Sequence, residues 1–321
     1  MARHAGVSQA TVSYALAGSA KISEVTRDRV LAAAEELGYR PNLAARSMRT
    51  RRTARLAILM PTLGDSRGEL LAAAGSVAVA AGYTLEIRTV PLEPVARAAA
   101  VDEVLGSGVY EGVLTFVPLP PEVVHRDGAP AVVVLSDAFD DRLRVTGDLL
   151  GADPLRRIVT ALAEQGQRRF VHLAGDPGYS SARGRRDAYL ETVARLGLTD
   201  LGVYECGWSG DRALAAVRSL PDDLPPVAII AGSDVLATAA VRECLARGWR
   251  VPQDAGVTGW DDLPTSAFQS PSLTTVRVDF GALGEWAMRS LVARVRGEAA
   301  PAELAGIQDI VWRESTPPLP R

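Results

Sequence analysis

The sequence contains very few of the residues that build metal sites and disulfide frameworks. Its 321 residues include two cysteines, Cys206 and Cys244, and three histidines, His4, His125 and His172. These are too few for a disulfide framework and too scattered for a zinc site, so we expect no metal site and reduced thiols in a cytoplasmic protein. The sequence has no run of about 18 apolar residues, so we expect no membrane span. The first residues also lack the continuous apolar segment of a secretory signal.

Motifs of common enzyme classes are also missing. The sequence has no Gly-x-Ser-x-Gly elbow, no Walker loop and no glycine fingerprint for dinucleotides. Gly106-Ser107-Gly108 has the wrong spacing and follows a predicted helix. We therefore expect neither an enzyme nor a cofactor, although aspartates in a cleft could resemble the carboxylate pair of a glycosidase.

The net charge is only −3, but the charges are unevenly distributed. Residues 1–55 hold ten basic and four acidic side chains, a net charge of +6, whereas residues 56–321 hold 25 basic and 34 acidic ones, a net charge of −9. A basic head on an acidic body indicates a nucleic-acid-binding segment joined to a domain with another task. The charge count alone leaves open an ordinary basic, solvated surface.

Two short helices are predicted in the head. Ser8 is a candidate N-cap for a helix over residues 9–17, and Val12 and Leu16 lie on the face that we expect to pack in a core. A second helix follows Ser23 and ends at Gly38. Its predicted apolar face consists of Val25, Val30, Ala33, Ala34 and Leu37. The tetrad AGVS, residues 5–8, comes directly before the first helix and is typical of the turn of a helix-turn-helix, with Gly6 at the tight position.

The motifs AGVSQATVS, TRDRV, LGYRPN and ARS follow one another at fixed spacing through the head. In this spacing the head resembles that of the lactose/galactose repressor (LacI/GalR) family. The resemblance implies that the first helix reads the major groove, with Gln9, Ala10 and Tyr14 at base-reading positions and short hydroxyls on phosphates. For Gln9 and Tyr14 the alternative is a solvated helix face. The predicted DNA-binding set is Ser8, Gln9, Ala10, Thr11, Ser13, Tyr14, Asn42, Arg46, Met48 and Arg49.

The stretch Leu43 to Arg49 resembles the hinge helix of that family. It is too short to be a stable isolated helix, so we expect it to form when two copies meet on DNA. The family inserts an apolar side chain from each hinge into the minor groove, and here Met48 occupies that position. The family also has about a turn and a half of helix before the first residues seen here. We expect a misassigned start, with Met1 standing where the family has valine.

Strand-like and helix-like segments alternate through the rest of the chain. The strand-like runs are 56–60, 84–89, 112–116, 131–135, 169–174, 203–206, 227–231 and 256–259. The helix-like stretches are 68–81, 95–105, 153–164, 182–196, 211–220, 234–247 and 280–296. This alternation predicts parallel sheets covered by helices, and the length favours two α/β halves.

The segments from Ala231 to Ala287 and from Ile310 to Pro318 also resemble the C-terminal part of the LacI/GalR family. The implied fold is a small all-α helix-turn-helix head and an α/β periplasmic-binding-protein-like body of two doubly wound parallel-sheet subdomains. We expect a head over 1–42, a hinge over 43–54 and a body over 55–321. The body divides into an N-subdomain, about 55–147 and 279–305, and a C-subdomain, about 148–278 and 306–321.

The resemblance also implies an effector site at the carboxyl ends of the strands. Arg185 best matches the effector arginine, with Arg183 as the alternative, and Trp208 matches an aromatic that stacks on the effector ring. Asp234 could instead be a helix N-cap, and Asp261-Asp262 could shape a turn. The predicted effector-binding set is Asp65, Phe116, Asp148, Arg185, Trp208, Ser233, Asp234, Trp260 and Asp261.

Carboxylates, one arginine and aromatic walls suit a sugar or nucleoside. Ser233 replaces the usual asparagine, and the loop around Asp65 lacks the family's aromatic residues, so we expect a different effector from those of the best-known members. We expect a transcriptional regulator, most simply a repressor, that binds pseudo-palindromic operator DNA as a homodimer. The alternative is a sugar-binding protein or cleft hydrolase of the same body fold without productive DNA binding.

Overall fold

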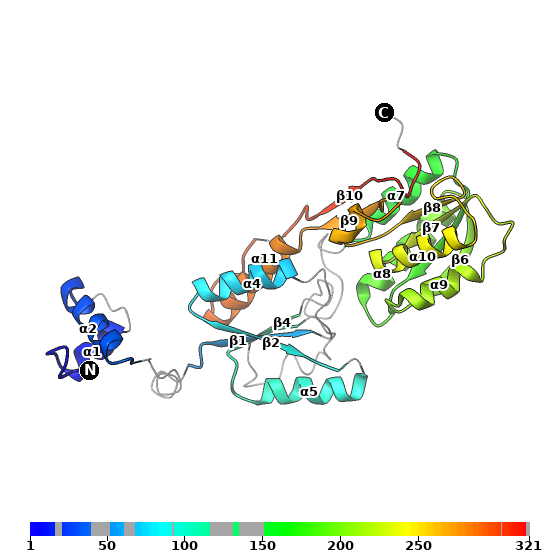
Figure 1. The fold of residues 1–321 in the computed structure, drawn as a ribbon. Helices are drawn as coiled ribbons and strands as arrows, with labels where there is room; N and C mark the ends of the chain where they lie inside the picture. The colour runs from blue at the N-terminus through cyan, green and yellow to red at the C-terminus, as the bar shows by residue number, and fades with distance from the viewer. Residues whose placement is uncertain are drawn as a thin grey trace. The chain divides into compact units, whose positions relative to one another are not determined.

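The computed structural model describes residues 1–16, 21–39, 52–60, 68–91, 93–115, 131–134, 151–302 and 304–318. These residues form two compact units, Met1–Ala54 and Arg55–Arg321 (Figure 1). Each unit has its own core. Within the described residues, no helix is both long and apolar enough to cross a membrane.

The head is a pair of packed helices preceded by a helical turn. Helix α1 covers Gln9–Leu16 and α2 covers Glu24–Glu36. The turn over residues 1–5 ends at Gly6, whose φ of 63° is left-handed. The amide of Gly6 donates to Arg3 O and that of Val7 donates to Ala2 O, the two bonds of a Schellman motif. The expected tight turn at Gly6 is therefore present.

The head core is small and comes from both helices. Val12 of α1 and Val30 of α2 are buried in it, and Leu16 packs against its edge. The prediction for the apolar face of α2 was wrong at two positions, because Val25 is 79% exposed and Leu37 is 48% exposed. Val25 is five residues before Val30, so at about 3.6 residues per turn it points about 140° away from Val30 and lies off the buried face, and Leu37 follows the last residue of α2.

The first sheet of the body is parallel, with strand order β2-β1-β3-β4. Its strands are β1 (Arg55–Met60), β2 (Thr84–Thr89), β3 (Gly112–Thr115) and β4 (Ala131–Val134). Helices α4 (Gly68–Ala80) and α11 (Phe280–Arg296) pack together on one face, and α5 (Pro94–Gly106) covers the other (Figure 1).

The second sheet repeats this plan with the order β6-β5-β7-β8. Its strands are β5 (Arg169–Ala174), β6 (Thr199–Glu205), β7 (Val227–Ala231) and β8 (Ala255–Thr258). Helices α9 (Gly210–Arg218) and α10 (Asp234–Ala246) share a core with one face of the sheet. Helices α7 (Asp153–Glu164) and α8 (Ser180–Arg195) pack on each other, and α8 also contacts β5 and β6. We call the two sheets of the body, each with the helices that cover it, the first and second lobes.

Two antiparallel strands run between the lobes. Strand β9 (Thr275–Val278) leads from the second lobe into α11, and β10 (Gln308–Val311) returns from α11 to Ser315, whose Oγ donates to Val257 O of β8 at 2.6 Å. A third connection is expected between β4 and α7 and lies outside the described residues. Most predicted elements are confirmed, but β9 was not predicted and β6 begins four residues earlier than expected.

Candidate functional site

The start of α1 presents the predicted base-reading side chains. Ser8 Oγ accepts a hydrogen bond from Thr11 N at 3.0 Å, so Ser8 is the N-cap that the sequence predicts. Gln9, Ala10 and Tyr14 are exposed, with Tyr14 at 48%, whereas Val12 is buried. Thr11 and Ser13 are half-buried at the edge of that face. The predicted DNA-contact residues Asn42, Arg46, Met48 and Arg49 lie outside the described residues.

In the second lobe, the candidate site is the edge where β5 and β7 end. In a parallel sheet of this order, the switch point lies between the first strand and the third, and ligands bind beyond the carboxyl ends there. The two strands are followed by Gly175 and Gly232, and a Cβ at Gly232 would lie 3.3 Å from Gly175 N. The backbones therefore approach each other closely at this point, and the side chains around it form the candidate site.

Arg185 of α8 is directed at this switch point. Its Nη1 donates to Gly232 O at 2.6 Å, and its guanidinium carbon lies 4.1 Å from the centroid of the Trp260 ring. Arg185 is 6% exposed and Trp260 is 1% exposed. This geometry supports Trp260 as a buried platform beneath Arg185 rather than as a second wall. The alternative residue, Arg183, donates to Pro177 O at 2.7 Å.

Trp208 lies across the end of β5. It is half-buried, packs against the core of the second lobe, and has a φ of 64°. The ring of Tyr179 meets it edge-on, with centroids 6.1 Å apart. A positive φ is energetically unfavourable for a bulky residue, and strained residues of this kind cluster at ligand-binding sites and turns.

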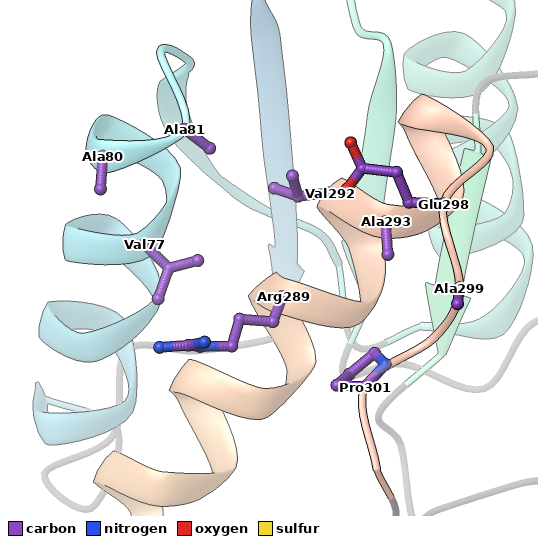
Figure 2. Close-up of a pocket in the computed structure, with 9 residues that line it drawn as sticks. All are labelled: Val77, Ala80, Ala81, Arg289, Val292, Ala293, Glu298, Ala299 and Pro301. Carbon is purple, nitrogen blue, oxygen red and sulfur yellow. The ribbon is translucent and has the colours of Figure 1, made fainter.

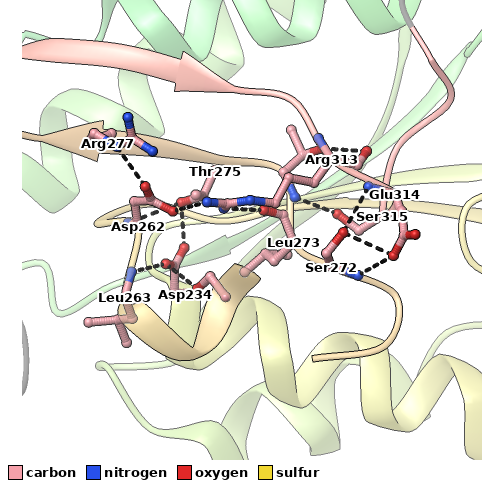
Figure 3. A network of polar contacts seen from close by, with 12 residues as sticks. Asp234, Asp262, Leu263, Ser272, Leu273, Thr275, Arg277, Arg313, Glu314 and Ser315 are labelled. Atoms are coloured by element: carbon pink, nitrogen blue, oxygen red, sulfur yellow. Dashed lines mark hydrogen bonds and ion pairs between the residues drawn. The ribbon is translucent and has the colours of Figure 1, made fainter. Parts of the chain in front are cut away.

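Asp234 is the first residue of α10, and both of its oxygens accept hydrogen bonds within the protein (Figure 3). Thr275 Oγ1 donates to Oδ1 at 2.5 Å, while Leu263 N and Ser266 Oγ donate to Oδ2 at 2.7 and 2.6 Å. Burial raises the pKa of the Asp234 carboxyl, and these three donors act in the opposite direction. The contacts support a structural role in holding the loop after β8 to β9.

Sequence reasoning did not assign a binding role to Asp262, which shares two ion pairs (Figure 3). Its carboxylate lies 2.7 Å from Arg277 Nε and 2.7 Å from Arg313 Nη2. Both Asp261, with φ 114°, and Asp262, with φ 51°, have left-handed backbones, which fits the expected turn. The doubled aspartate marked the position, but its arginine partners are 15 and 51 residues away in the sequence, so no local pattern could have identified them.

The remaining predicted effector residues divide into two groups. Ser233 is the N-cap of α10, and its Oγ accepts from Leu236 N at 3.4 Å. Asp65, Phe116 and Asp148, which the sequence also assigns to the predicted site, lie outside the described residues. In the parts of the chain that the structure describes, no group of three or more potential metal ligands occurs.

A cavity of about 440 Å³ lies elsewhere, between α4, α11 and the segment that follows α11 (Figure 2). Its lining is mostly small and apolar, with Arg289 and Glu298 as its charged residues. None of the predicted effector residues contributes to it.

Comparison with known proteins covers both units of the chain. The family model described as bacterial regulatory proteins, lacI family, matches residues 1–42, and the model of a periplasmic binding protein-like domain matches residues 159–316. The HTH-type transcriptional regulator CelR of Thermobifida fusca is 31% identical to this chain over an alignment that is 330 residues long with its gaps and covers 97% of this chain and 95% of CelR.

Solved structures of transcriptional regulators also match nearly the whole chain. The Lac repressor dimer bound to operator and the anti-inducer ONPF matches with a TM-score of 0.81 and 25% identity, covering 98% of this chain and 97% of the repressor chain. The complex of the transcriptional regulator CelR with cellobiose matches with a TM-score of 0.70 and 27% identity, covering 98% of each chain.

Proposed function

Because the chain belongs to the LacI family of bacterial regulatory proteins, we propose that it is a DNA-binding transcriptional repressor controlled by a small molecule. The exposed start of α1 carries this proposal. Ser8 caps the helix, and the adjacent Gln9 and Ala10 are exposed where a major-groove reader needs them. Gln9 can pair with an adenine edge and Ala10 can contact a thymine methyl group. We propose no catalytic activity, since the named relatives are regulators.

We propose that the effector is a sugar or nucleoside bound between the two subdomains of the body. Trp208 offers an aromatic surface for the C–H face of a ring, and Arg185 brings a guanidinium to the same edge of the sheet. CelR has been solved with cellobiose, which fits this class of ligand. In this proposal, residues 148–278 and 306–321 form one wall, and residues 55–147 and 279–305 form the other.

We further propose that two copies pair through their bodies on pseudo-palindromic DNA in the cytoplasm, with residues 43–54 as the hinge. Closure on the effector would shift one subdomain against the other and change how the hinges form, so that effector and operator affinities are linked. A stable tetramer in light scattering would contradict the proposed dimer.

A selection experiment tests DNA binding. The full chain is used to select duplexes from a random-sequence library, and binding to the selected duplex is followed by fluorescence anisotropy. We expect a two-fold symmetric site, and weaker binding for Met48→Ala at every effector concentration. Val25→Ala, which alters a 79% exposed side chain of α2, is the matched control and should bind as the native chain does. Recovery of no preferred duplex would refute the proposal.

A thermal-shift experiment tests the effector. Cellobiose, ribose and cytidine are added separately, because a ligand at about 100 times its Kd stabilises the folded state by about 2.7 kcal/mol. We expect at least one of them to raise Tm and to change operator affinity. Trp208→Ala should lose both responses but keep operator binding without effector. If Trp208→Ala responded like the native chain, the assigned site would be wrong.

A further inference from the structure

The closest approach at the switch point is between Gly175 and the Trp208 indole. A Cβ on Gly175 would lie only 2.1, 2.3 and 2.4 Å from Cη2, Cζ3 and Cζ2 of Trp208. Real Cβ atoms do not approach other heavy atoms this closely. The outer ring of the indole therefore lies directly on the backbone of Gly175, in space that a side chain of any other residue would occupy.

Trp208 is also held in place through its own backbone. Cys206 N donates to Ala174 O at 2.8 Å, which ties the turn before Trp208 to the end of β5. On the other side, Ser209 N donates to Cys206 O at 3.0 Å, and Ser209 Oγ caps α9 by accepting from Arg212 N at 3.4 Å. The left-handed backbone at Trp208 is thus fixed on both sides, so an added methyl group would be accommodated by rotation of the indole rather than by movement of the backbone.

The same backbone segment also positions Arg185, the second residue that we propose to bind the effector. Gly232 O, which accepts the Arg185 hydrogen bond, belongs to the strand end that lies against Gly175. The height of the Trp208 ring above the sheet and the position of the Arg185 guanidinium are therefore both set at one backbone contact.

From this geometry we infer that Gly175 is a positioning residue of the effector site, which lets the Trp208 ring lie at the depth where a sugar or nucleoside ring stacks on it. The inference rests on the proposed function for the role of Trp208. Gly175 itself acts through Trp208, because it supplies only its backbone. A Cβ at this position would push the aromatic surface out of register with Arg185.

The chain offers a matched control for Gly175→Ala. Gly184 lies in α8 of the same lobe, has no positive φ, and has open space where its Cβ would be. Gly184→Ala therefore adds the same methyl group without a collision. The variant Trp208→Phe supplies the rescue, because a phenyl ring lacks the outer atoms that Gly175→Ala would meet.

The first measurement needs no ligand. The full chain is labelled with 4-fluorotryptophan, whose fluorine is on Cε3 rather than on one of the three atoms nearest Gly175. The five tryptophans should give separate ¹⁹F signals, and Trp208→Phe assigns one of them. Gly175→Ala should move the Trp208 signal by more than its line width, whereas Gly184→Ala should leave that signal in place. An unmoved Trp208 signal in Gly175→Ala would overturn the inference.

The second measurement uses cellobiose, ribose and cytidine as the probes. Gly175→Ala should weaken binding of the responsive probe by about tenfold, the order of one lost stacking contact. In the Trp208→Phe background the same change should cost less than about twofold, because neighbouring effects that act through one group are not additive. An equal loss in both backgrounds would make Gly175 merely structural, and unchanged binding in the native background would also refute its role.

The two measurements separate this inference from the proposed function. If no probe binds the native chain, the proposed effector class fails, and the ¹⁹F signal alone still decides whether Gly175 sets the position of Trp208.

Discussion

We expect acid to destabilise the second lobe because His172 is buried in β5 as a neutral ring. Its Nδ1 lies 2.7 Å from Ile230 O, which makes this nitrogen the donor, and its ring stacks on Tyr189 with centroids 5.2 Å apart. Burial lowers the pKa of His172 from 6.5 to about 4. In the unfolded chain, His172 therefore binds a proton near pH 6.5, whereas in the folded chain the His172 ring stays neutral until about pH 4.

The sign and size of the effect follow from this difference. His172 contributes its full stability above about pH 6.5, and the contribution is lost as pH falls toward 4. A difference of this size corresponds to about 3 kcal/mol, of which about 2 kcal/mol should be lost between about pH 7 and pH 5. The slope should approach about 1.4 kcal/mol per pH unit from this single group.

The measurement compares the native chain with His172→Asn, whose amide can still donate to Ile230 O but does not titrate. Free energies of unfolding come from urea titrations at several pH values, followed by intrinsic tryptophan fluorescence, to which Trp249 and Trp260, both buried in the second lobe, contribute. His172→Asn should be less stable than the native chain at neutral pH, but its free energy of unfolding should change less with pH. His4→Asn, in the separate head unit, is the control and should keep the native slope. Parallel curves for native and His172→Asn would refute the reasoning.

Two further substitutions test the packing of the body. Gly284→Ala should destabilise the first lobe by about 1–3 kcal/mol, because its Cβ would lie 2.3 Å from the carbonyl oxygen of Leu70 in α4; a higher Tm, as helix propensity alone predicts, would contradict this. Asp262→Asn should cost about 2 kcal/mol in urea unfolding, since its ion pair with Arg313 is largely shielded from solvent. Asp222→Asn, at a 97% exposed carboxylate, is the control, and an equal cost there would argue against a special role for Asp262.

Periodicity located most elements of the fold because each buries one face. Residues 153–164 and 280–296 were predicted as helices with the bounds that α7 and α11 have. Strand β9 was not predicted, because it has only four residues and its antiparallel partner β10 begins 30 residues after it. On α2, Val25 lies about 140° around the helix from Val30, so helical spacing itself excludes it from the buried face.

The sequence by itself determined the head motif, the family resemblance, the alternation of strands and helices, and the edge of the sheet where we propose the effector site. These depend on neighbours in the chain, on spacing, and on turn residues such as Gly6. Only the tertiary structure decided that Trp260 is buried beneath Arg185, that Asp234 is fully engaged with the loop after β8, and that Trp208 rests on Gly175. Each of these contacts joins residues separated by 29 to 75 positions, and whether a polar or aromatic side chain faces a ligand or another part of the protein depends on that distant partner.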